Sequence, residues 1–399
     1  SCLYLSQKFQ IPYFLSKLLT LRNINEYKIN DYLDASLVKN LPNPFLLNDM
    51  EKAVSRLIEA LKNNEKIGII ADYDVDGATS ASILFKFLKN YTSNIVLKTP
   101  NRLMDGYGPN IRIMNEMLNI NATLVFALDC GTTSFDIIDN EKYKIIDIII
   151  IDHHLSEFNL PKVHSVVNPN RFDEKNNFKD MAAVGVTFLF LMALRKKIRE
   201  VNFLNKKPEP NLMKYLDLVA LGTVCDVVSL TNHNRAFVKI GLDLIKKRQN
   251  LGIKKILDNS NIQNTPTSLD LAYIIGPQLN AASRLDDSSL PSKLLISEDK
   301  IEIEKISKKL LLLNEKRKLI EKKIFEKALI QAEKQTKSNY ILVYGEDWHV
   351  GVLGIVASKL ISYFYKPIIV IAFNNKIGIG SARSIKNIDL GQIIIHAKN

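Results

Sequence analysis

The sequence predicts an α/β protein whose first domain is built on a parallel sheet. Three short apolar runs, in GIIADYDVDG, LVFALDCG and IIIIDHHLSE, each end in a polar turn that leads into the next segment. Apolar strands that alternate with helical segments in this way form parallel sheets covered on both faces. Ligands collect at the carboxyl ends of such strands, where all three runs place acidic residues.

The composition fits a cytoplasmic protein with a polyanionic partner. The chain has 399 residues, 46% of them hydrophobic, which is enough for two or three domains. Its net charge of +12 favours nucleic acid as the partner. Three cysteines without a CxxC pair indicate a reducing compartment. The longest apolar stretch, residues 181–194, is shorter than the roughly 20 residues of a membrane span, so we expect a buried helix and no membrane partner.

Breaks in the pattern divide the chain into four parts. Residues 1–50 form an N-terminal segment that ends in a Pro/Asn loop, and residues 51–298 form the first α/β domain, which opens on a helix over 50–64. Residues 299–338 contain no Gly or Pro and predict one long connecting helix. Residues 339–399 show strand, loop, helix and strand, which predicts a smaller α/β domain that is still incomplete at Asn399.

The ADYDVDG motif predicts a cation site. In an extended segment, Asp72, Asp74 and Asp76 would face the same side, and three converging negative charges repel unless a cation neutralises them. Gly77 lets the chain turn directly into a helix. An acidic turn exposed to solvent is the alternative for this motif alone. A calcium loop is not expected, because the next residues lead into an apolar helix and offer few further oxygen ligands.

Further candidate ligands follow other apolar runs. Asp129 ends the second strand, His153 and His154 end the third after Asp152, and Asp226 follows a later apolar run. Carboxylates combined with imidazole suit Mn²⁺ better than Ca²⁺, and two-metal hydrolysis needs a carboxylate shared by both ions. The seven candidate ligands, which suffice for two ions, are Asp72, Asp74, Asp76, Asp129, His153, His154 and Asp226.

These motifs, in this order, resemble those of the DHH phosphoesterase superfamily, whose name describes Asp152, His153 and His154. Several flanking stretches resemble more specifically the RecJ family of single-stranded-DNA-specific exonucleases. They are NPFLLNDMEKAV, PNRLMDGYGPN, NPNR, AAVGVTF, LDLVALGTVCDVVSL, GPQLNAASRLDD, WHVGVLGIVASKL and GSARSI. The resemblance implies a DHH catalytic domain over 51–298 and a partial DHHA1-type substrate-binding domain over 339–399.

The resemblance also implies roles for individual residues. Two Mn²⁺ or Mg²⁺ ions would be held by acids and one imidazole, with Asp129 as the bridge and Asp72 as an additional acid at the first site. His154 would face the scissile phosphate, and Asp152 would orient its neighbours. Arg284, Ser381 and Arg383 would bind the 5′ phosphate, since guanidinium groups bind phosphate oxygens in pairs. The metal ligands implied are Asp72, Asp74, Asp76, Asp129, His153 and Asp226.

The expected function is a metal-dependent 5′ to 3′ exonuclease that hydrolyses single-stranded DNA in repair and recombination. The resemblance further implies helicase and single-strand-binding protein as partners. Two alternatives stay open: a DHH-type hydrolase of short oligonucleotides or cyclic dinucleotides, and a truncated DNA-binding protein that does not cleave. The arginines could also form ordinary surface ion pairs.

Overall fold

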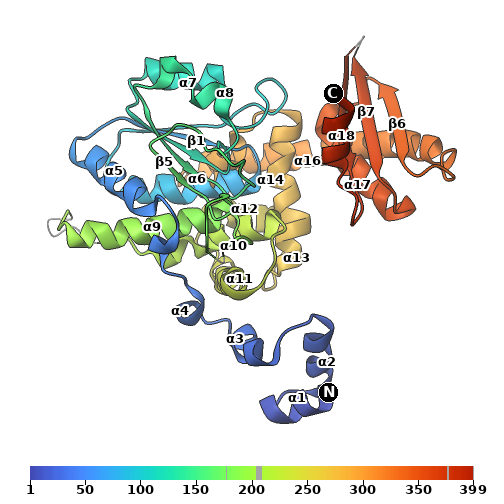
Figure 1. Cartoon of the computed structure of the whole chain (residues 1–399), viewed down its shortest axis with the longest axis horizontal. Helices are drawn as coiled ribbons and strands as arrows, with labels where there is room; N and C mark the ends of the chain where they lie inside the picture. Colours follow the sequence, from blue (N-terminus) through green and yellow to red (C-terminus); the bar gives the residue numbers. More distant parts are fainter. Residues whose placement is uncertain (177, 204–208, 375–376, 399) are drawn as a thin grey trace.

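The computed structural model describes residues 1–176, 178–203, 209–374 and 377–398, and confirms the α/β class (Figure 1). Its larger sheet has five parallel strands in the order β2-β1-β3-β4-β5. The strands are β1 (Ile67–Ala71), β2 (Ile95–Lys98), β3 (Leu124–Leu128), β4 (Asp147–Ile151) and β5 (Ser165–Val167).

The isoleucine-rich strand β4 is buried on both faces. Ile149 and Ile151 belong to the larger core, which the sheet forms with α5 (Met50–Lys62), α6 (Val75–Leu88), α9 (Ala183–Glu200) and α10 (Leu216–Cys225). Ile148 and Ile150 belong to the smaller core beneath α7 (Ile111–Asn119) and α8 (Phe135–Ile138). Successive side chains of a strand point to opposite faces, so the apolar run reflects helices on both sides of the sheet.

The stretch predicted as a buried helix forms most of α9. Its apolar side chains, from Val184 to Leu194, lie in the larger core between the sheet and neighbouring helices. Over the described ranges, no helix combines the length and apolar character needed to cross a membrane.

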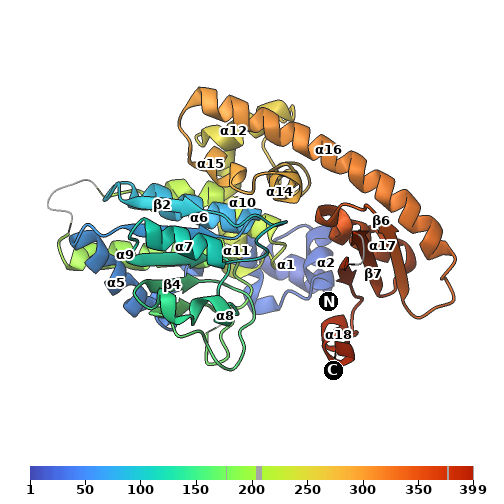
Figure 2. The same cartoon turned by 90° about the horizontal axis from the view of Figure 1, so that it is seen from above.

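The predicted connecting helix is α16 (Lys300–Glu333), which is 34 residues long. At about 1.5 Å per residue it spans about 50 Å. Ile303 and Leu310, in its first half, pack in the larger core, whereas Ile324 and Ala328 pack in the core of the second unit. Figure 2 shows α16 running from one unit to the other. The helix is therefore part of both cores.

The second unit contains a three-stranded sheet in the order β6-β7-β8. Strands β6 (Ile341–Glu346) and β7 (Ile368–Asn374) are parallel, and β8 (Ile377–Arg383) is antiparallel to β7. The sequence predicted β6, α17 (Leu353–Phe364) and β7 but not β8. Trp348 is 7% exposed and packs in this core. The last helix described is α18 (Leu390–Lys398).

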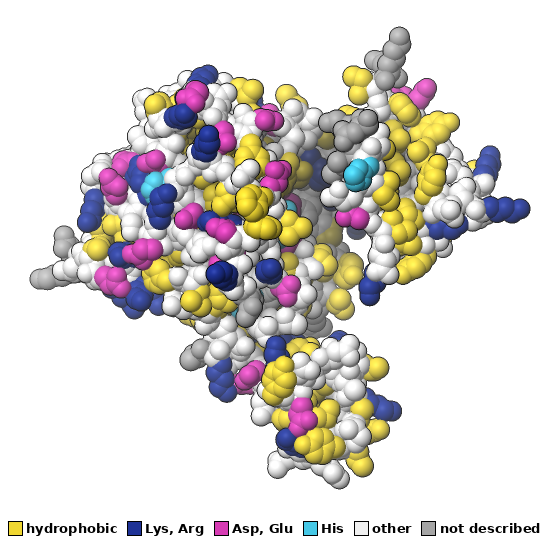
Figure 3. Space-filling view, in the orientation of Figure 1, with side chains coloured by type: hydrophobic (Ala, Val, Ile, Leu, Met, Phe, Trp, Pro, Cys, Tyr) yellow, Lys and Arg dark blue, Asp and Glu magenta, His cyan; other side chains and the backbone are white. Residues whose placement is uncertain are grey.

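The remaining helices connect or extend these two units. Helices α3 (Ile29–Asp34) and α4 (Leu37–Asn40) contact the larger unit, with Leu37 in its core, whereas α1 (Cys2–Phe9) and α2 (Tyr13–Leu21) extend away from it (Figure 1). Between α10 and α16 lie α11 (Asn232–Lys246), α12 (Leu251–Asn259), α14 (Gly276–Leu285) and α15 (Leu290–Ile296). The space-filling view shows a groove between the two units (Figure 3).

Close packing of α10 on α11 should make Gly241 intolerant of a side chain. A methyl group on Gly241 would lie 2.2 Å from Ala220 Cβ and 2.3 Å from the Leu216 carbonyl oxygen. We expect Gly241→Ala to lower the free energy of unfolding by about 1–3 kcal/mol, measured by urea denaturation, because overpacking forces backbone shifts. Gly391→Ala, whose methyl group would meet only Asp389 Oδ1 at 3.3 Å, is the control. Equal stability of the two variants would contradict the expectation.

Candidate metal centre

Three acids stand at adjacent positions along the carboxyl edge of the large sheet. Asp72, Asp129 and Asp152 each lie one residue beyond β1, β3 and β4. Their backbone N–H groups donate to Leu128, Ile151 and Val167 carbonyls of the neighbouring strand at 3.1, 2.9 and 3.1 Å. The sheet's hydrogen bonding thus continues through the acids and fixes their spacing.

The prediction that Asp72, Asp74 and Asp76 share one face of an extended segment was wrong. Asp74 is the N-cap of α6, and Asp76 already lies in the first turn of that helix. Asp74 Oδ1 accepts hydrogen bonds from the N–H groups of Asp76 and Gly77 at 2.8 and 3.0 Å, which turns the chain into the helix at once. Gly77 is required because a methyl group there would lie 2.4 Å from the Asp72 carbonyl oxygen.

The acids nevertheless converge, in groups that share members. Ligand atoms of Asp72, Asp74 and Asp129 lie within 4.8 Å of one another, as do those of Asp76, His153 and Asp226. Asp129 also groups with both histidines. Asp129 therefore belongs to two of these groups, which is the position expected of a carboxylate that bridges two cations.

Unpartnered buried atoms show that these residues fit metal ions. Within the described ranges, Asp72 Oδ1, Asp129 Oδ1, His153 Nε2 and Asp226 Oδ2 are buried and have no hydrogen-bond partner. Such atoms destabilise a fold unless something satisfies them. All four belong to the groups just described, so cations bound there would satisfy them together.

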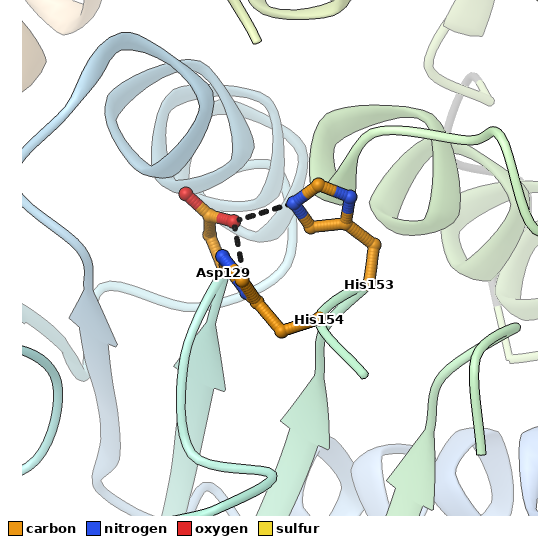
Figure 4. A group of neighbouring side chains, drawn as sticks. All are labelled: Asp129, His153 and His154. Atoms are coloured by element: carbon orange, nitrogen blue, oxygen red, sulfur yellow. Dashed lines mark ion pairs between the residues drawn. The ribbon is translucent and has the colours of Figure 1, made fainter. Parts of the chain in front are cut away.

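Both histidine rings approach Asp129 (Figure 4), but the side chain of His153 is the more buried of the two. His153 Nε2 is 3.4 Å from Asp129 Oδ1, and its Nδ1 is 3.6 Å from Asp226 Oδ2. The His154 side chain is 48% exposed, and its Nδ1 is 2.8 Å from Asp152 Oδ1. Asp152 is thus placed to hold the ring of His154, leaving an imidazole edge open to solvent.

Asp76 joins the cluster to α9. Its two carboxylate oxygens accept hydrogen bonds from the N–H groups of Ala183 and Val184, at 2.7 and 2.9 Å. These donors belong to the first turn of α9, whose backbone groups are otherwise unsatisfied. The helix end therefore fixes the carboxylate in place. Burial, followed by repulsion from Asp226 and Asp74, raises the pKa of Asp76 well above its usual value, and the hydrogen bonds from the helix end offset this only in part.

Burial and mutual repulsion oppose ionisation of the cluster. Burial, with added repulsion from Asp74, raises the pKa of Asp72 to about 8 and the pKa of Asp226 to about 7. The pKa of Asp129 is raised well above its usual value by burial and then by Asp76. Burial lowers the pKa of His153, which favours the neutral, ligating imidazole. A bound cation would stabilise the ionised carboxylates and so lower the pKa values of the acids.

Arg284, Ser381 and Arg383 meet around the start of α17. Arg284 Nη1 donates to the Gly351 carbonyl oxygen at 2.8 Å. A methyl group on Gly354 would lie 3.1 Å from Ser381 Oγ and 3.2 Å from Arg383 Nη2. Arg284 of α14 thus contacts the segment that precedes α17, and Ser381 and Arg383 of β8 lie against the first turn of α17.

The environment of Arg284 differs from that of a surface ion pair. Burial, with repulsion from Arg102 and Arg317, lowers the pKa of Arg284 to about 10. Positive groups held close together favour a bound anion, which would offset their repulsion. Arg102 was not predicted; its guanidinium lies 5.0 Å from the centre of the Tyr73 ring.

Tyr107 is a second residue of the site that was not predicted from the sequence. Its Oη donates to the Asp129 carbonyl oxygen at 2.6 Å and lies 3.1 Å from His154 Nδ1. Gly106 and Gly108, on either side, have φ of 80° and 72°. A tyrosine between two glycines was a weak signal that the loop is shaped to place this side chain.

Comparison with known proteins agrees with this geometry. Residues 66–223 match the DHH family, N-terminal domain, and residues 337–399 match the DHHA1 domain. The single-stranded-DNA-specific exonuclease RecJ of Haemophilus influenzae is 36% identical over 96% of this chain and 68% of its own length. The chain belongs to the RecJ family.

Solved RecJ structures have the same fold. A crystal structure of exonuclease RecJ bound to manganese is 30% identical, with a TM-score of 0.76 over 89% of this chain and 86% of that one. RecJ of Thermus thermophilus in complex with Mn²⁺ is 27% identical, with a TM-score of 0.82 over 99% of this chain and 55% of that one. The chain therefore spans about two thirds of the H. influenzae RecJ and about half of the Thermus RecJ chain.

Metal-free protein should lose stability as the pH rises from about 5 to about 8. The carboxyls of Asp72 and Asp226 have pKa values of about 8 and 7 when folded, against roughly 3.9 when unfolded. Between these values the folded state holds more protons, so raising the pH favours unfolding, on the order of a few kcal/mol. Chemical denaturation in EDTA should show this decline.

Saturating Mn²⁺ should remove most of that decline, because a cation stabilises the ionised acids. Asp226→Asn, which deletes one of the titrating groups, should make the metal-free decline shallower. A metal-free stability that rises over this pH range would contradict the assignment of these acids to one buried cluster.

Proposed function

We propose that this chain is a metal-dependent 5′ to 3′ exonuclease that hydrolyses single-stranded DNA to nucleotides in DNA repair and recombination. The observation that carries the proposal is the buried cluster whose unpartnered atoms come from Asp72, Asp129, His153 and Asp226. The name of the H. influenzae relative, a single-stranded-DNA-specific exonuclease, supports the choice of substrate.

The cluster would hold two Mn²⁺ or Mg²⁺ ions. Relatives solved with Mn²⁺, and one with Mg²⁺, support this choice. Bound at such a site, the ions lower the pKa of water and neutralise charge on a phosphate in hydrolysis. Asp72, Asp74 and Asp129 would hold one ion, and Asp76, Asp129, His153 and Asp226 the other.

His154 would contact the scissile phosphate. Its imidazole lies outside the most buried part of the cluster, and Asp152 holds its Nδ1 at 2.8 Å. Asp152 raises the pKa of His154, against the lowering effect of burial. A raised pKa favours the protonated ring, which would donate a hydrogen bond to a phosphate oxygen from Nε2. Asp129 would take part in catalysis as the carboxylate shared by the two ions.

Arg284, Ser381 and Arg383 would bind the 5′ phosphate, with Arg102 nearby. Their position beside the N-terminal end of α17 supports this role, because backbone N–H groups there add positive potential. A phosphate held at this point, across from the cluster, would set the direction of digestion. The chain's positive charge would add affinity that falls as salt rises.

By family resemblance, the cellular partners would be single-stranded DNA, a helicase and a single-strand-binding protein, and the location would be the cytoplasm. A helicase would supply the single strand from duplex DNA. Salt-sensitive binding of an oligonucleotide to the purified chain is the simplest first measurement of this interaction.

Digestion of end-labelled DNA tests the proposal. With Mn²⁺, the chain should release mononucleotides from the 5′ end of single strands and leave duplex intact. Asp129→Ala should reduce the rate by at least about a thousandfold, because removal of the shared carboxylate disrupts both metal positions. Cleavage of short oligonucleotides or cyclic dinucleotides alone would favour a DHH-type hydrolase of those substrates. Binding without cleavage, with either Mn²⁺ or Mg²⁺, would favour a DNA-binding protein that does not cleave.

Arg383→Ala should weaken selection of the DNA end. We expect KM for a 5′-phosphorylated strand to rise about tenfold, with little change for a 5′-hydroxyl strand, because only the former loses a charge-assisted hydrogen bond. Lys386→Ala removes the same charge from a nearby exposed position and is the control. If both variants affect the two substrates equally, Arg383 contributes only general positive potential.

A further inference from the structure

The NPNR stretch, residues 168–171, follows β5 and contains two asparagines that lie against the histidine pair. We propose that Asn168 and Asn170 are positioning residues, each of which holds one histidine: Asn170 holds the metal-binding His153, and Asn168 holds His154. The inference rests on the proposed function for the role of His154, and on the metal cluster alone for His153.

Each asparagine donates to the backbone carbonyl of a different histidine. Asn170 Nδ2 donates to the His153 carbonyl oxygen at 2.5 Å and to that of Lys179 at 3.0 Å. Asn168 Nδ2 donates to the His154 carbonyl oxygen at 2.9 Å and lies 3.0 Å from Thr132 Oγ1. Each amide therefore holds the backbone carbonyl of one histidine.

Asp152 holds the backbone N–H groups of the same two histidines. Its Oδ1 accepts hydrogen bonds from the N–H groups of His153 and His154, at 2.8 and 3.2 Å. Side chains thus satisfy all four backbone hydrogen-bonding groups of a pair that lies outside any strand or helix. Because these groups are fixed, the directions of the two Cα–Cβ bonds are fixed with them.

The turn that carries the asparagines is itself rigid. Pro169, which lies between the two asparagines, has its φ angle fixed by its ring. Asn168 Oδ1 accepts a hydrogen bond from the Asn170 N–H at 2.8 Å. The buried guanidinium of Arg171 donates to the Val166 carbonyl at 2.7 Å and to Asp49 Oδ2 at 2.9 Å. The amides are therefore held in place independently of the histidines they contact.

Because the imidazoles differ in role, removing each amide should have a different effect. Loosening His153 moves a ligand atom of the Asp76, His153 and Asp226 group. Loosening His154 leaves that group intact and moves only the ring expected at the phosphate. A purely structural role would give the two asparagines the same effect.

The test uses the full chain and measures Mn²⁺ binding directly by titration calorimetry. Asn170→Ala should weaken Mn²⁺ binding about tenfold, within the usual cost of losing a residue that supports a ligand. Asn168→Ala should leave Mn²⁺ affinity within about twofold. At saturating Mn²⁺, Asn168→Ala should lower kcat for nucleotide release about tenfold with KM unchanged.

Two control variants remove neighbouring hydrogen bonds in which neither histidine takes part. Ser156 Oγ accepts from the Phe172 N–H at 2.8 Å and ties the same two segments together, so Ser156→Ala should leave Mn²⁺ affinity unchanged. Thr132→Val removes the other partner of Asn168 and should retain kcat. Asn168→Ser replaces Asn168→Ala if the fully buried position does not tolerate alanine.

Equal loss of Mn²⁺ affinity in both asparagine variants would overturn the proposal, as would losses of the same size in the controls. Unchanged affinity in Asn170→Ala would also overturn it. If the wild-type chain binds Mn²⁺ but cleaves no DNA, the proposed function fails, whereas the difference in Mn²⁺ affinity between the two variants still decides this inference.

Discussion

The structure depends on one electrostatic constraint: several carboxylates are held close together in a buried place. The parallel register puts Asp72, Asp129 and Asp152 at neighbouring strand ends, and their N–H groups extend the hydrogen bonding of the sheet. The acids cannot move apart without breaking that register. Repulsion must therefore be relieved by protonation or by cations, and oxygen and imidazole ligands at this spacing favour cations.

Helix ends and backbone N–H groups hold the acids of the cluster in place. Asp74 begins α6, Asp76 is fixed by the first turn of α9, and Asp152 is fixed by the histidine N–H groups. Helix α16, which contributes to two cores, ties this rigid centre to the unit that carries Ser381 and Arg383. Phosphate chemistry relies on such fixed placement of charge, because the groups then need little rearrangement during reaction.

The three strands that carry acids, β1, β3 and β4, and most of the candidate site could be predicted from sequence, because each apolar run directly precedes its acid. Strands β2 and β5 of the same sheet were not predicted. The same pattern did not show how the chain turns after Asp72. The Asp74 side chain caps helix α6, which begins at Val75, whereas the prediction kept the chain extended as far as Asp76. Strand β8 was missed because Gly378 and Gly380 weaken its strand pattern.

Residues that act through backbone groups leave little or no signal in the sequence. Tyr107 and Asn168 reach Asp129 and His154 by contacts across 22 and 14 positions of the chain. Such contacts have no fixed spacing and leave no periodic pattern. Arg102 was missed for a related reason: its charge matters only because folding brings it near Arg284.

The central claim is that the buried acids form one two-ion site with Asp129 between the ions. Anomalous scattering from a crystal soaked in Mn²⁺ tests this most directly. The account predicts two peaks, each beside an oxygen of Asp129, with His153 and Asp226 at one of them. A single peak, or two peaks of which neither contacts Asp129, would contradict it.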